Sequence, residues 1–221
     1  MRNAIKYFVG ATYKPLLVKY LSKTKNYQYN GIKLIIPPEV FHPGFFFSTK
    51  LLLKYLDQYP LKGKTFLELG AGSGLIAISA AKKGAEVTAT DINPVAVDFL
   101  KKNCEANNVW MNIILSDLFQ NIPSQHFDFI AINPPYYKKQ PHIYKDYSWY
   151  CGANGEYFQT MFASLADYMH PDSAALMILC EGCDVEMIKT IAGKNGFYLD
   201  LVYSKQNLFE RDFIFQIKMA E

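Results

Sequence analysis

The chain has 221 residues, of which 50% are hydrophobic and 15% aromatic, which is enough for one large core and rather short for two. The formal net charge of +3 excludes neither a protein nor a nucleic-acid partner. No apolar run approaches the roughly 20 residues that cross a bilayer, and basic residues interrupt any N-terminal signal segment, so we expect a cytoplasmic protein with no membrane association.

The N-terminal segment is basic. Seven of the 23 Lys and Arg residues precede the first acidic residue, Glu39, which leaves the rest of the chain with 16 basic and 20 acidic residues. Tyrosines interleave with these lysines. The segment is therefore either a solvated face or a docking arm for RNA or an acidic protein. We predict an extension over residues 1–48, with a helix at 15–22 and a strand at 32–36, that packs on or caps a main domain at 49–221.

An apolar loop joins the extension to the main domain. It contains Pro37-Pro38 and then His42-Pro43-Gly44-Phe45-Phe46-Phe47. Three consecutive phenylalanines cannot all face one side of a regular element. The loop either packs against the edge of a sheet or lines the mouth of a pocket, and a helix over 48–59 follows it.

From residue 65 onward, β-type runs alternate with helical stretches. The predicted strands are 65–69, 86–90, 112–115, 127–132, 174–180, 197–203 and 213–218, and the predicted helices are 75–83, 94–107, 156–169 and 185–193. This alternation is typical of an α/β fold. We expect a Rossmann-like, seven-stranded, mostly parallel sheet with helices on both faces and one antiparallel strand near the C-terminus.

A glycine-rich turn links the first core strand to the first core helix. Its sequence is Glu68-Leu69-Gly70-Ala71-Gly72-Ser73-Gly74, and glycines there allow close approach of backbone to a ligand. Leu75 stands where the dinucleotide pattern G-x-G-x-x-G needs its third glycine, and this counts against a bound pyrophosphate.

Three carboxylates surround this turn. Asp91 ends the next strand, where it either accepts both hydroxyls of a ribose or caps the following helix. Asp117 lies at the same edge, suited to an adenine amine, and Glu68 is placed to meet a ligand ammonium. A ligand with adenine, ribose and an amino acid but no phosphate matches S-adenosylmethionine. We expect it to be bound by Glu68, Gly70, Ala71, Gly72, Gly74, Asp91, Ile92, Asp117, Leu118 and Asn133.

The motif Asn133-Pro134-Pro135-Tyr136 follows a buried strand. Its structural interpretation is a strand terminator, because proline cannot continue a ladder. Its functional interpretation is an acceptor site, in which the Asn133 side-chain oxygen and the Pro134 carbonyl bind the two N–H groups of a planar nitrogen while Tyr136 stacks on it. Asn133, Pro134 and Tyr136 are the predicted catalytic residues.

These motifs together resemble class I S-adenosylmethionine-dependent methyltransferases of the HemK-like, N5-glutamine type. The resemblance covers about residues 65–221 and includes Thr90-Asp91-Ile92-Asn93-Pro94 and the segment Trp149-Tyr150-Cys151-Gly152-Ala153-Asn154-Gly155. It implies that residues 49–221 form a methyltransferase domain that binds S-adenosylmethionine.

Two features depart from this pattern. Family members that modify release factors have a larger N-terminal helical domain than about 48 residues allow. The stretch from Val40 to Ser48 looks more like a loop of small-domain ribosomal RNA guanine methyltransferases, although these have Asn-Pro-Pro-Phe. We therefore consider three hypotheses: methylation of a protein glutamine amide in a release-factor-like substrate, methylation of an exocyclic base amine (N6 of adenine or N2 of guanine) in structured rRNA or tRNA, and a scaffold that binds the cofactor without turnover.

The remaining candidates carry no predicted role. Cys180 and Cys183 form a single Cys-x-x-Cys with no second pair nearby, and a structural zinc site needs four ligands. We expect free buried thiols and no metal site. The four histidines lack ligand spacing.

Overall fold

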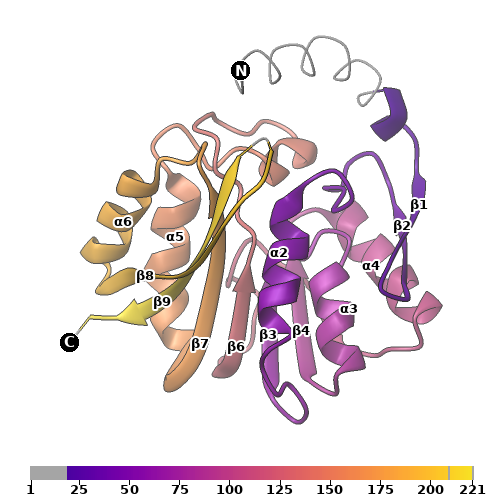
Figure 1. Ribbon diagram of the computed structural model, residues 1–221, viewed down its shortest axis with the longest axis horizontal. Coiled ribbons are helices and arrows are strands. Elements are labelled where there is room, and N and C mark those ends of the chain that lie inside the picture. Colours follow the sequence, from indigo (N-terminus) through magenta and orange to yellow (C-terminus); the bar gives the residue numbers. More distant parts are fainter. Residues whose placement is uncertain (1–18, 209, 221) are drawn as a thin grey trace.

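The computed structural model describes residues 19–208 and 210–220, and its centre is a seven-stranded sheet in the order β5-β4-β3-β6-β7-β9-β8 (Figure 1). β9 alone runs antiparallel to the other six strands of this sheet. The strands are β3 (Thr65–Leu69), β4 (Glu86–Asp91), β5 (Asn112–Leu115), β6 (Phe127–Ile132), β7 (Met169–Cys180), β8 (Phe197–Gln206) and β9 (Arg211–Met219). The predicted fold is confirmed.

Helices cover both faces of the sheet and enclose two apolar cores (Figure 1). One core contains Leu52, Ile76 and Leu100, which come from three different helices, and the other contains Phe158 and Ile188. The helices on the first face are α2 (Phe47–Leu56), α3 (Leu75–Lys82) and α4 (Pro94–Ala106), and those on the second are α5 (Glu156–Leu165) and α6 (Val185–Lys194).

The order in which the chain adds strands to the sheet reverses between β3 and β6. From β3 it proceeds outward to β4 and β5, and then crosses to β6 on the other side of β3. Leu69, the last residue of β3, pairs with Thr90 of β4 and with Ile132 of β6. Gly70, Asp91 and Asn133 therefore follow adjacent positions at one edge, where open α/β sheets bind their ligands.

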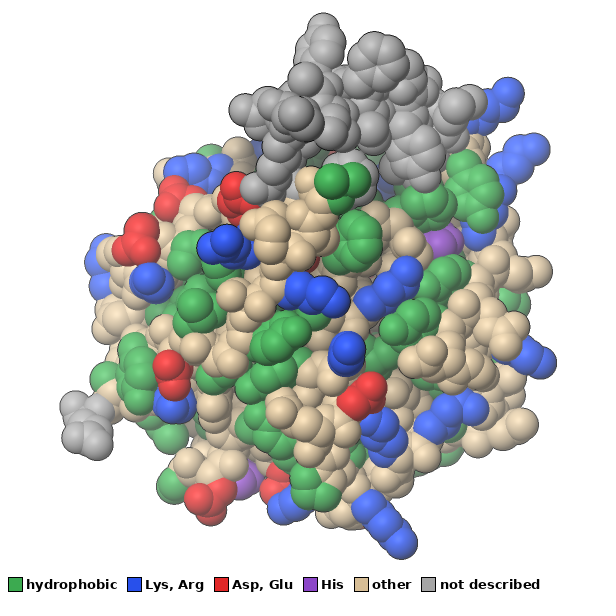
Figure 2. Space-filling model, viewed as in Figure 1, with side chains coloured by type: hydrophobic (Ala, Val, Ile, Leu, Met, Phe, Trp, Pro, Cys, Tyr) green, Lys and Arg blue, Asp and Glu red, His purple; other side chains and the backbone are tan. Residues whose placement is uncertain are grey.

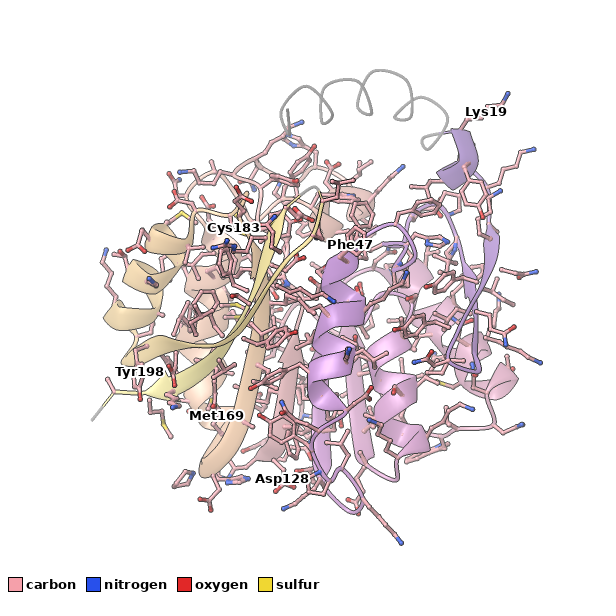
Figure 3. The ribbon with its side chains drawn as sticks, viewed as in Figure 1. Lys19, Phe47, Asp128, Met169, Cys183 and Tyr198 are labelled. Carbon is pink, nitrogen blue, oxygen red and sulfur yellow. The ribbon has the colours of Figure 1, made fainter. Side chains whose placement is uncertain are left out.

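The two ends of the sheet are clearly separated (Figure 3). Phe47 and Cys183 lie toward the carboxyl ends of the parallel strands, whereas Asp128 and Met169 lie at the opposite end. At that opposite end the Asp128 carboxylate accepts hydrogen bonds from Lys64 Nζ and from the backbone N–H of Thr65, so its role is structural.

A small hairpin precedes the main sheet. It consists of β1 (Lys25–Tyr29) and β2 (Ile32–Ile36), of which only β2 is predicted from the sequence. The turn residues Asn30 and Gly31 both have positive φ, 47° and 77°. Two such residues form the turn that joins two antiparallel strands most readily, and Asn-Gly is its strongest sequence signal. The Asn-Gly signal was present in the sequence, but the strand Lys25–Tyr29 before it is short, and its alternation consists of only Tyr27 and Tyr29.

Two asparagines hold this hairpin, Asn103 within α4 and Asn107 at its C-terminal cap. The Asn103 amide accepts a hydrogen bond from Ile35 N at 2.7 Å and donates to Ile35 O at 3.2 Å, so it pairs with the strand as another strand would. Asn107 makes the same pair of bonds with Lys33. Asn103 also donates to Ser73 O in the glycine-rich turn, at 3.0 Å. One side chain thus connects the hairpin to the turn.

Several predicted boundaries differ from the observed ones. The helix predicted over 156–169 ends at Leu165, and a single 3-10 turn, η2 (Ala166–Tyr168), leads into β7. β7 starts at Met169, five residues before the predicted position. Its pairing register with β6 shifts between Phe127 and Phe129, and this irregularity accommodates Pro171 within the strand. The helix predicted over 15–22 lies partly outside the described residues. Within the described part, residues 19–21 are helical.

No helix in the described part of the chain is long and apolar enough to cross a membrane.

Candidate functional site

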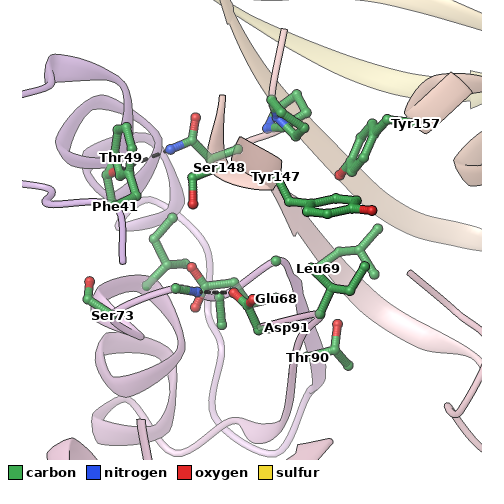
Figure 4. Close-up of a pocket in the computed structure, with 18 of the residues that line it drawn as sticks. Phe41, Thr49, Glu68, Leu69, Ser73, Thr90, Asp91, Tyr147, Ser148 and Tyr157 are labelled. Carbon is green, nitrogen blue, oxygen red and sulfur yellow. Dashed lines mark hydrogen bonds between the residues drawn. The ribbon is translucent and has the colours of Figure 1, made fainter. Parts of the chain in front are cut away.

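A pocket opens at the carboxyl edge of the sheet, between the ends of β3 and β6 (Figure 4). Its open space, the mouth included, is about 1100 Å³. Nearly all of the predicted site residues line it: Glu68, Gly70, Ala71, Gly72, Asp91, Ile92, Asp117, Leu118, Asn133, Pro134 and Tyr136.

Gly74 is the predicted residue that does not line the pocket. It has φ +80° and caps the N-terminus of α3, and a Cβ built on it would lie 2.1 Å from Leu100 Cδ1. Glycine at this position is therefore required by packing against α4. Gly70 also has positive φ, +75°, but no atom lies within 4 Å of its built Cβ, which leaves open space on the ligand side.

Asp91 and the glycine-rich turn are joined by hydrogen bonds. Asp91 Oδ2 accepts from Gly72 N at 2.8 Å and Oδ1 accepts from Asn93 N at 2.8 Å. A carboxylate has about four acceptor positions, so Asp91 can still accept from a ligand hydroxyl. The pKa of Asp91 is raised because burial disfavours its charge, and the backbone bonds oppose that shift. The helix cap of α4 is Asn93, which accepts from Val95 N, so Asp91 is not needed as a cap.

Glu68 lies at the base of the pocket. Its Oε2 accepts a hydrogen bond from Ala77 N, in the first turn of α3, at 2.7 Å. Burial raises the pKa of Glu68 to about 8, and the bond from Ala77 counteracts part of that shift. A cationic group beside this side chain would restore its negative charge, which fits the predicted contact with an ammonium.

Asn133 is anchored through the nitrogen of its amide. Nδ2 donates to Thr49 Oγ1, on α2, at 3.1 Å (Figure 4). Among the described residues, no donor reaches Asn133 Oδ1 or the Pro134 carbonyl. Pro134 and Pro135 are buried, so the backbone of the motif is held firmly. The two oxygens predicted to grip an acceptor therefore remain available.

Aromatic side chains line the mouth of the pocket. Phe41 and Trp149 contact each other with ring centroids 5.3 Å apart, and Phe46 packs on both. Tyr136 packs on Tyr137, and its pKa is raised by burial and then by the neighbouring Cys180. Sequence reasoning did not assign roles to the pocket residues Phe41, Thr49, Thr90, Tyr144, Tyr147 and Tyr157.

The three consecutive phenylalanines of the apolar loop before α2 have different surroundings. Phe45 packs on His42 and Tyr20, Phe46 packs on Trp149, and Phe47 is 47% exposed. Together with Phe41 and Pro43, which line the pocket, this arrangement supports the pocket-mouth interpretation for part of the loop.

Cys180 and Cys183 are both free thiols, with their sulfur atoms 3.8 Å apart. Cys180 is buried, as expected, whereas Cys183 is partly exposed.

One buried polar group of the pocket lacks a hydrogen-bond partner in the described part of the chain. Thr90 lines the pocket, and its hydroxyl is buried without a hydrogen-bond partner among the described residues. Buried polar atoms are normally satisfied, so this hydroxyl is suited to a ligand. Together with the free lone pairs of Asp91 and the open space at Gly70, it fits a nucleoside bound along the edge of the sheet.

Comparison with known proteins agrees with this geometry. A family model described as "Methyltransferase small domain" matches residues 32–148. A putative protein N5-glutamine methyltransferase of Methanocaldococcus jannaschii is 48% identical over 107 residues, which are 48% of this chain and 52% of that protein. The chain spans about half or less of the length of the curated relatives that it matches.

Solved structures have the same fold. A Thermus thermophilus 16S rRNA N2 G1207 methyltransferase, in complex with AdoMet and guanosine, has a TM-score of 0.65 at 20% identity, covering 90% of this chain and 50% of that one. The Encephalitozoon cuniculi Mtq2–Trm112 complex, responsible for methylation of the eRF1 termination factor, gives a TM-score of 0.62 at 20% identity, covering 82% and 99%.

Proposed function

The chain belongs to the methyltransferase small domain family of S-adenosylmethionine-dependent enzymes, and from that membership we propose that it methylates a planar nitrogen, namely a glutamine side-chain amide in a protein. The observation that carries the proposal is the arrangement of Asn133. Its NH₂ group is bound to Thr49, and its oxygen is left free beside the cofactor pocket. The similarity to a putative N5-glutamine methyltransferase supports this choice of acceptor.

We propose that the cofactor lies along the carboxyl edge of β3, β4 and β5. Gly70, Ala71 and Gly72 would lie against its amino-acid end, and Glu68 would face its ammonium. Asp91 would accept the ribose hydroxyls, with Ile92, Asp117 and Leu118 around the adenine. Bound S-adenosylmethionine supplies an electrophilic methyl group on a sulfonium.

The acceptor nitrogen must be strengthened as a nucleophile, because the lone pair of an amide is delocalised into its carbonyl. Asn133 Oδ1 and the Pro134 carbonyl would accept its two N–H bonds and favour a pyramidal nitrogen whose lone pair is aimed at the methyl carbon. Tyr136 would hold the flat face of the amide. In-line attack needs the nitrogen within about 3–3.5 Å of that carbon. As the N–C bond forms, the S–C bond of the sulfonium would break and leave a neutral thioether. The N–H proton would then become acidic and pass to water, so no side chain has to remove it beforehand.

Labelled methyl transfer tests the proposal directly. The purified protein and S-adenosylmethionine with a labelled methyl group are incubated with a cell extract, and the label is followed through nuclease and protease digestion. We expect label that protease releases and nuclease does not, with Asn133→Ala protein as the matched control. Acid hydrolysis cleaves a methylated side-chain amide to a carboxylic acid and labelled methylamine, so release of that amine distinguishes it from methylated lysine or arginine, which survive hydrolysis. Label confined to nuclease-sensitive material would refute the protein substrate.

A second candidate, methylation of an exocyclic amine of an RNA base, is favoured by the basic N-terminal segment. Of its cations, Lys19 and Lys23 are exposed, and Lys25 Nζ lies 3.9 Å from the centroid of the Tyr20 ring. On the described face seen in Figure 2, however, Lys and Arg side chains are dispersed among hydrophobic and acidic ones. RNA binding predicts affinity that falls steeply with salt, because phosphate contacts release counterions. Flat salt dependence favours the protein.

The third hypothesis, a scaffold without turnover, has no support from the pocket. Asn133, Asp91 and the glycine-rich turn are all present and all line it. We also propose that the chain divides into an N-terminal extension, residues 1–48, and a methyltransferase domain, residues 49–221. The basic N-terminal segment would dock the macromolecule that carries the acceptor.

A further inference from the structure

Thr49, a residue of α2, faces the proposed acceptor site. It is the third residue of α2, its side chain is 7% exposed, and it lines the pocket. Its hydroxyl oxygen lies 3.1 Å from Asn133 Nδ2, a residue 84 positions away in the sequence. Leu52 and Leu56, on the same helix, are buried in the core, so the position of the hydroxyl is fixed by packing of the whole helix.

The orientation of the Asn133 amide determines whether the proposed acceptor can bind. An asparagine side chain ends in an acceptor oxygen and a donor NH₂ group of nearly the same size and shape. With the NH₂ group turned toward the acceptor, two sets of N–H donors would face each other. Only the orientation that points Oδ1 at the acceptor allows the grip described above.

In this structure Thr49 accepts a hydrogen bond from the NH₂ group of Asn133, which leaves Oδ1 on the side of the amide away from Thr49. Among the described residues, it supplies the only hydrogen bond found for the Asn133 side chain. Because threonine is branched at Cβ, its hydroxyl has few accessible rotamers in a helix. A bond donated by the NH₂ group also polarises the amide, which makes Oδ1 a stronger acceptor. Neither effect requires Thr49 to touch the acceptor or the cofactor.

We propose that Thr49 is a positioning residue that fixes the Asn133 amide with its oxygen directed at the acceptor nitrogen. This inference rests on the proposed function, since it assigns Thr49 a role in the same site. It predicts that loss of the hydroxyl lowers the rate of methyl transfer and leaves cofactor binding unchanged.

Thr49→Val is the main test, because valine keeps the branched shape and removes the hydroxyl. With the extract fraction that accepts label, at saturating S-adenosylmethionine, we expect the initial rate to fall about 10- to 100-fold, the range for a misplaced catalytic group. The Kd for S-adenosylmethionine, measured by calorimetry, should stay within about twofold. Thr49→Ser should restore most of the rate. Thr190→Val, on the exposed face of α6, is the matched control and should keep the full rate.

A double-mutant cycle separates positioning from a general structural effect. If Thr49 acts through Asn133, then Thr49→Val should cause no further loss in an Asn133→Ala background. Equal losses in both backgrounds would overturn the positioning role, as would a normal rate for Thr49→Val. In NMR spectra of the apo protein, the side-chain NH₂ protons of Asn133 should exchange faster with water in Thr49→Val. Thr49→Ala provides the same comparisons if the valine variant is unstable.

The same cycle distinguishes the two levels of inference. Normal turnover by Asn133→Ala would refute the proposed function whatever Thr49 does. A strong loss in Asn133→Ala together with normal turnover in Thr49→Val would leave the proposed function intact and refute only the positioning role.

Discussion

The carboxylate of Asp91 accepts a hydrogen bond from the backbone N–H of Gly72 at 2.8 Å, joining the end of β4 to the glycine-rich turn after β3. The bond holds the carboxylate beside the turn, and both Asp91 and Gly72 line the pocket (Figure 4). Asp91 therefore both stabilises the turn and is the proposed ligand of the ribose.

Asp91→Asn should weaken binding of S-adenosylmethionine. The amide still offers one oxygen to a backbone N–H, but the charge and half of the acceptor capacity are lost. Hydrogen bonds to charged groups contribute about 1.5–3 kcal/mol each, so we expect Kd to rise at least tenfold in calorimetry. Asp98→Asn, at an exposed position of α4, is the control. Unchanged affinity in the Asp91 variant would remove this residue from the cofactor site.

Asn133→Ala should separate chemistry from cofactor binding. The side-chain oxygen is proposed to act on the acceptor nitrogen, so turnover should fall about 100- to 1,000-fold, as for loss of one group that stabilises a transition state. The Kd for S-adenosylmethionine should change by a few-fold at most. Methyl transfer and calorimetry on the same preparation measure both quantities. Near-normal turnover with poor cofactor affinity is the pattern that contradicts the assigned role.

Gly74→Ala should destabilise the fold more than Gly70→Ala does. Both positions have φ near +80°, which costs a non-glycine residue about 1–2 kcal/mol. At Gly74 the new Cβ would also meet Leu100, which is fully buried, and overpacking typically adds about 1–3 kcal/mol. Urea denaturation without ligand measures the difference between the two variants. Equal losses of unfolding free energy would mean that α4 yields to the extra methyl group.

Glu68→Gln should change how stability depends on pH. Burial raises the pKa of Glu68 to about 8 in the folded protein, from an ordinary value of 4.5. Between these values the unfolded chain has released the proton while the folded chain still holds it, so the free energy of unfolding declines as pH rises. Below pH 4.5 both states are protonated and the effect vanishes. Above pH 8 the loss is complete.

The measurement is urea denaturation of the apo protein at several pH values between 4.5 and 8.5. Wild-type protein should lose stability relative to Glu68→Gln across this window. The exposed Glu86→Gln serves as control. Parallel curves for wild type and Glu68→Gln would show that the buried carboxyl is ionised throughout.

The central part of the fold could be predicted because local and long-range signals coincide there. Short apolar runs, glycines after β3 and a proline at the start of α4 all mark the same boundaries. The predicted pocket residues also follow from topology, since the carboxyl ends of adjacent parallel strands meet at one edge. Gly70, Asp91 and Asn133 come together for that reason.

The residues that escaped prediction depend on contacts between distant segments. A threonine near the start of a helix has many ordinary roles, and nothing local links Thr49 to Asn133. Tyr157 reaches the pocket from α5 for a similar reason: only the packing of that helix decides which of its side chains face inward. The β1 strand was missed because its sequence, Lys-Asn-Tyr-Gln-Tyr, is short and mostly polar, although Tyr27 and Tyr29 pack against the core in the folded chain.

Asn103 gives the hairpin and the glycine-rich turn a shared attachment, since a single amide binds both Ile35 and Ser73. Neither segment can loosen without straining the other. By thermodynamic reciprocity, if a ligand at the turn changes the affinity of the hairpin for a partner, that partner changes the affinity for the ligand by the same factor. A macromolecule that binds the hairpin would then bind more tightly when the methyl donor is bound. The donor would in turn bind more tightly while that macromolecule is attached.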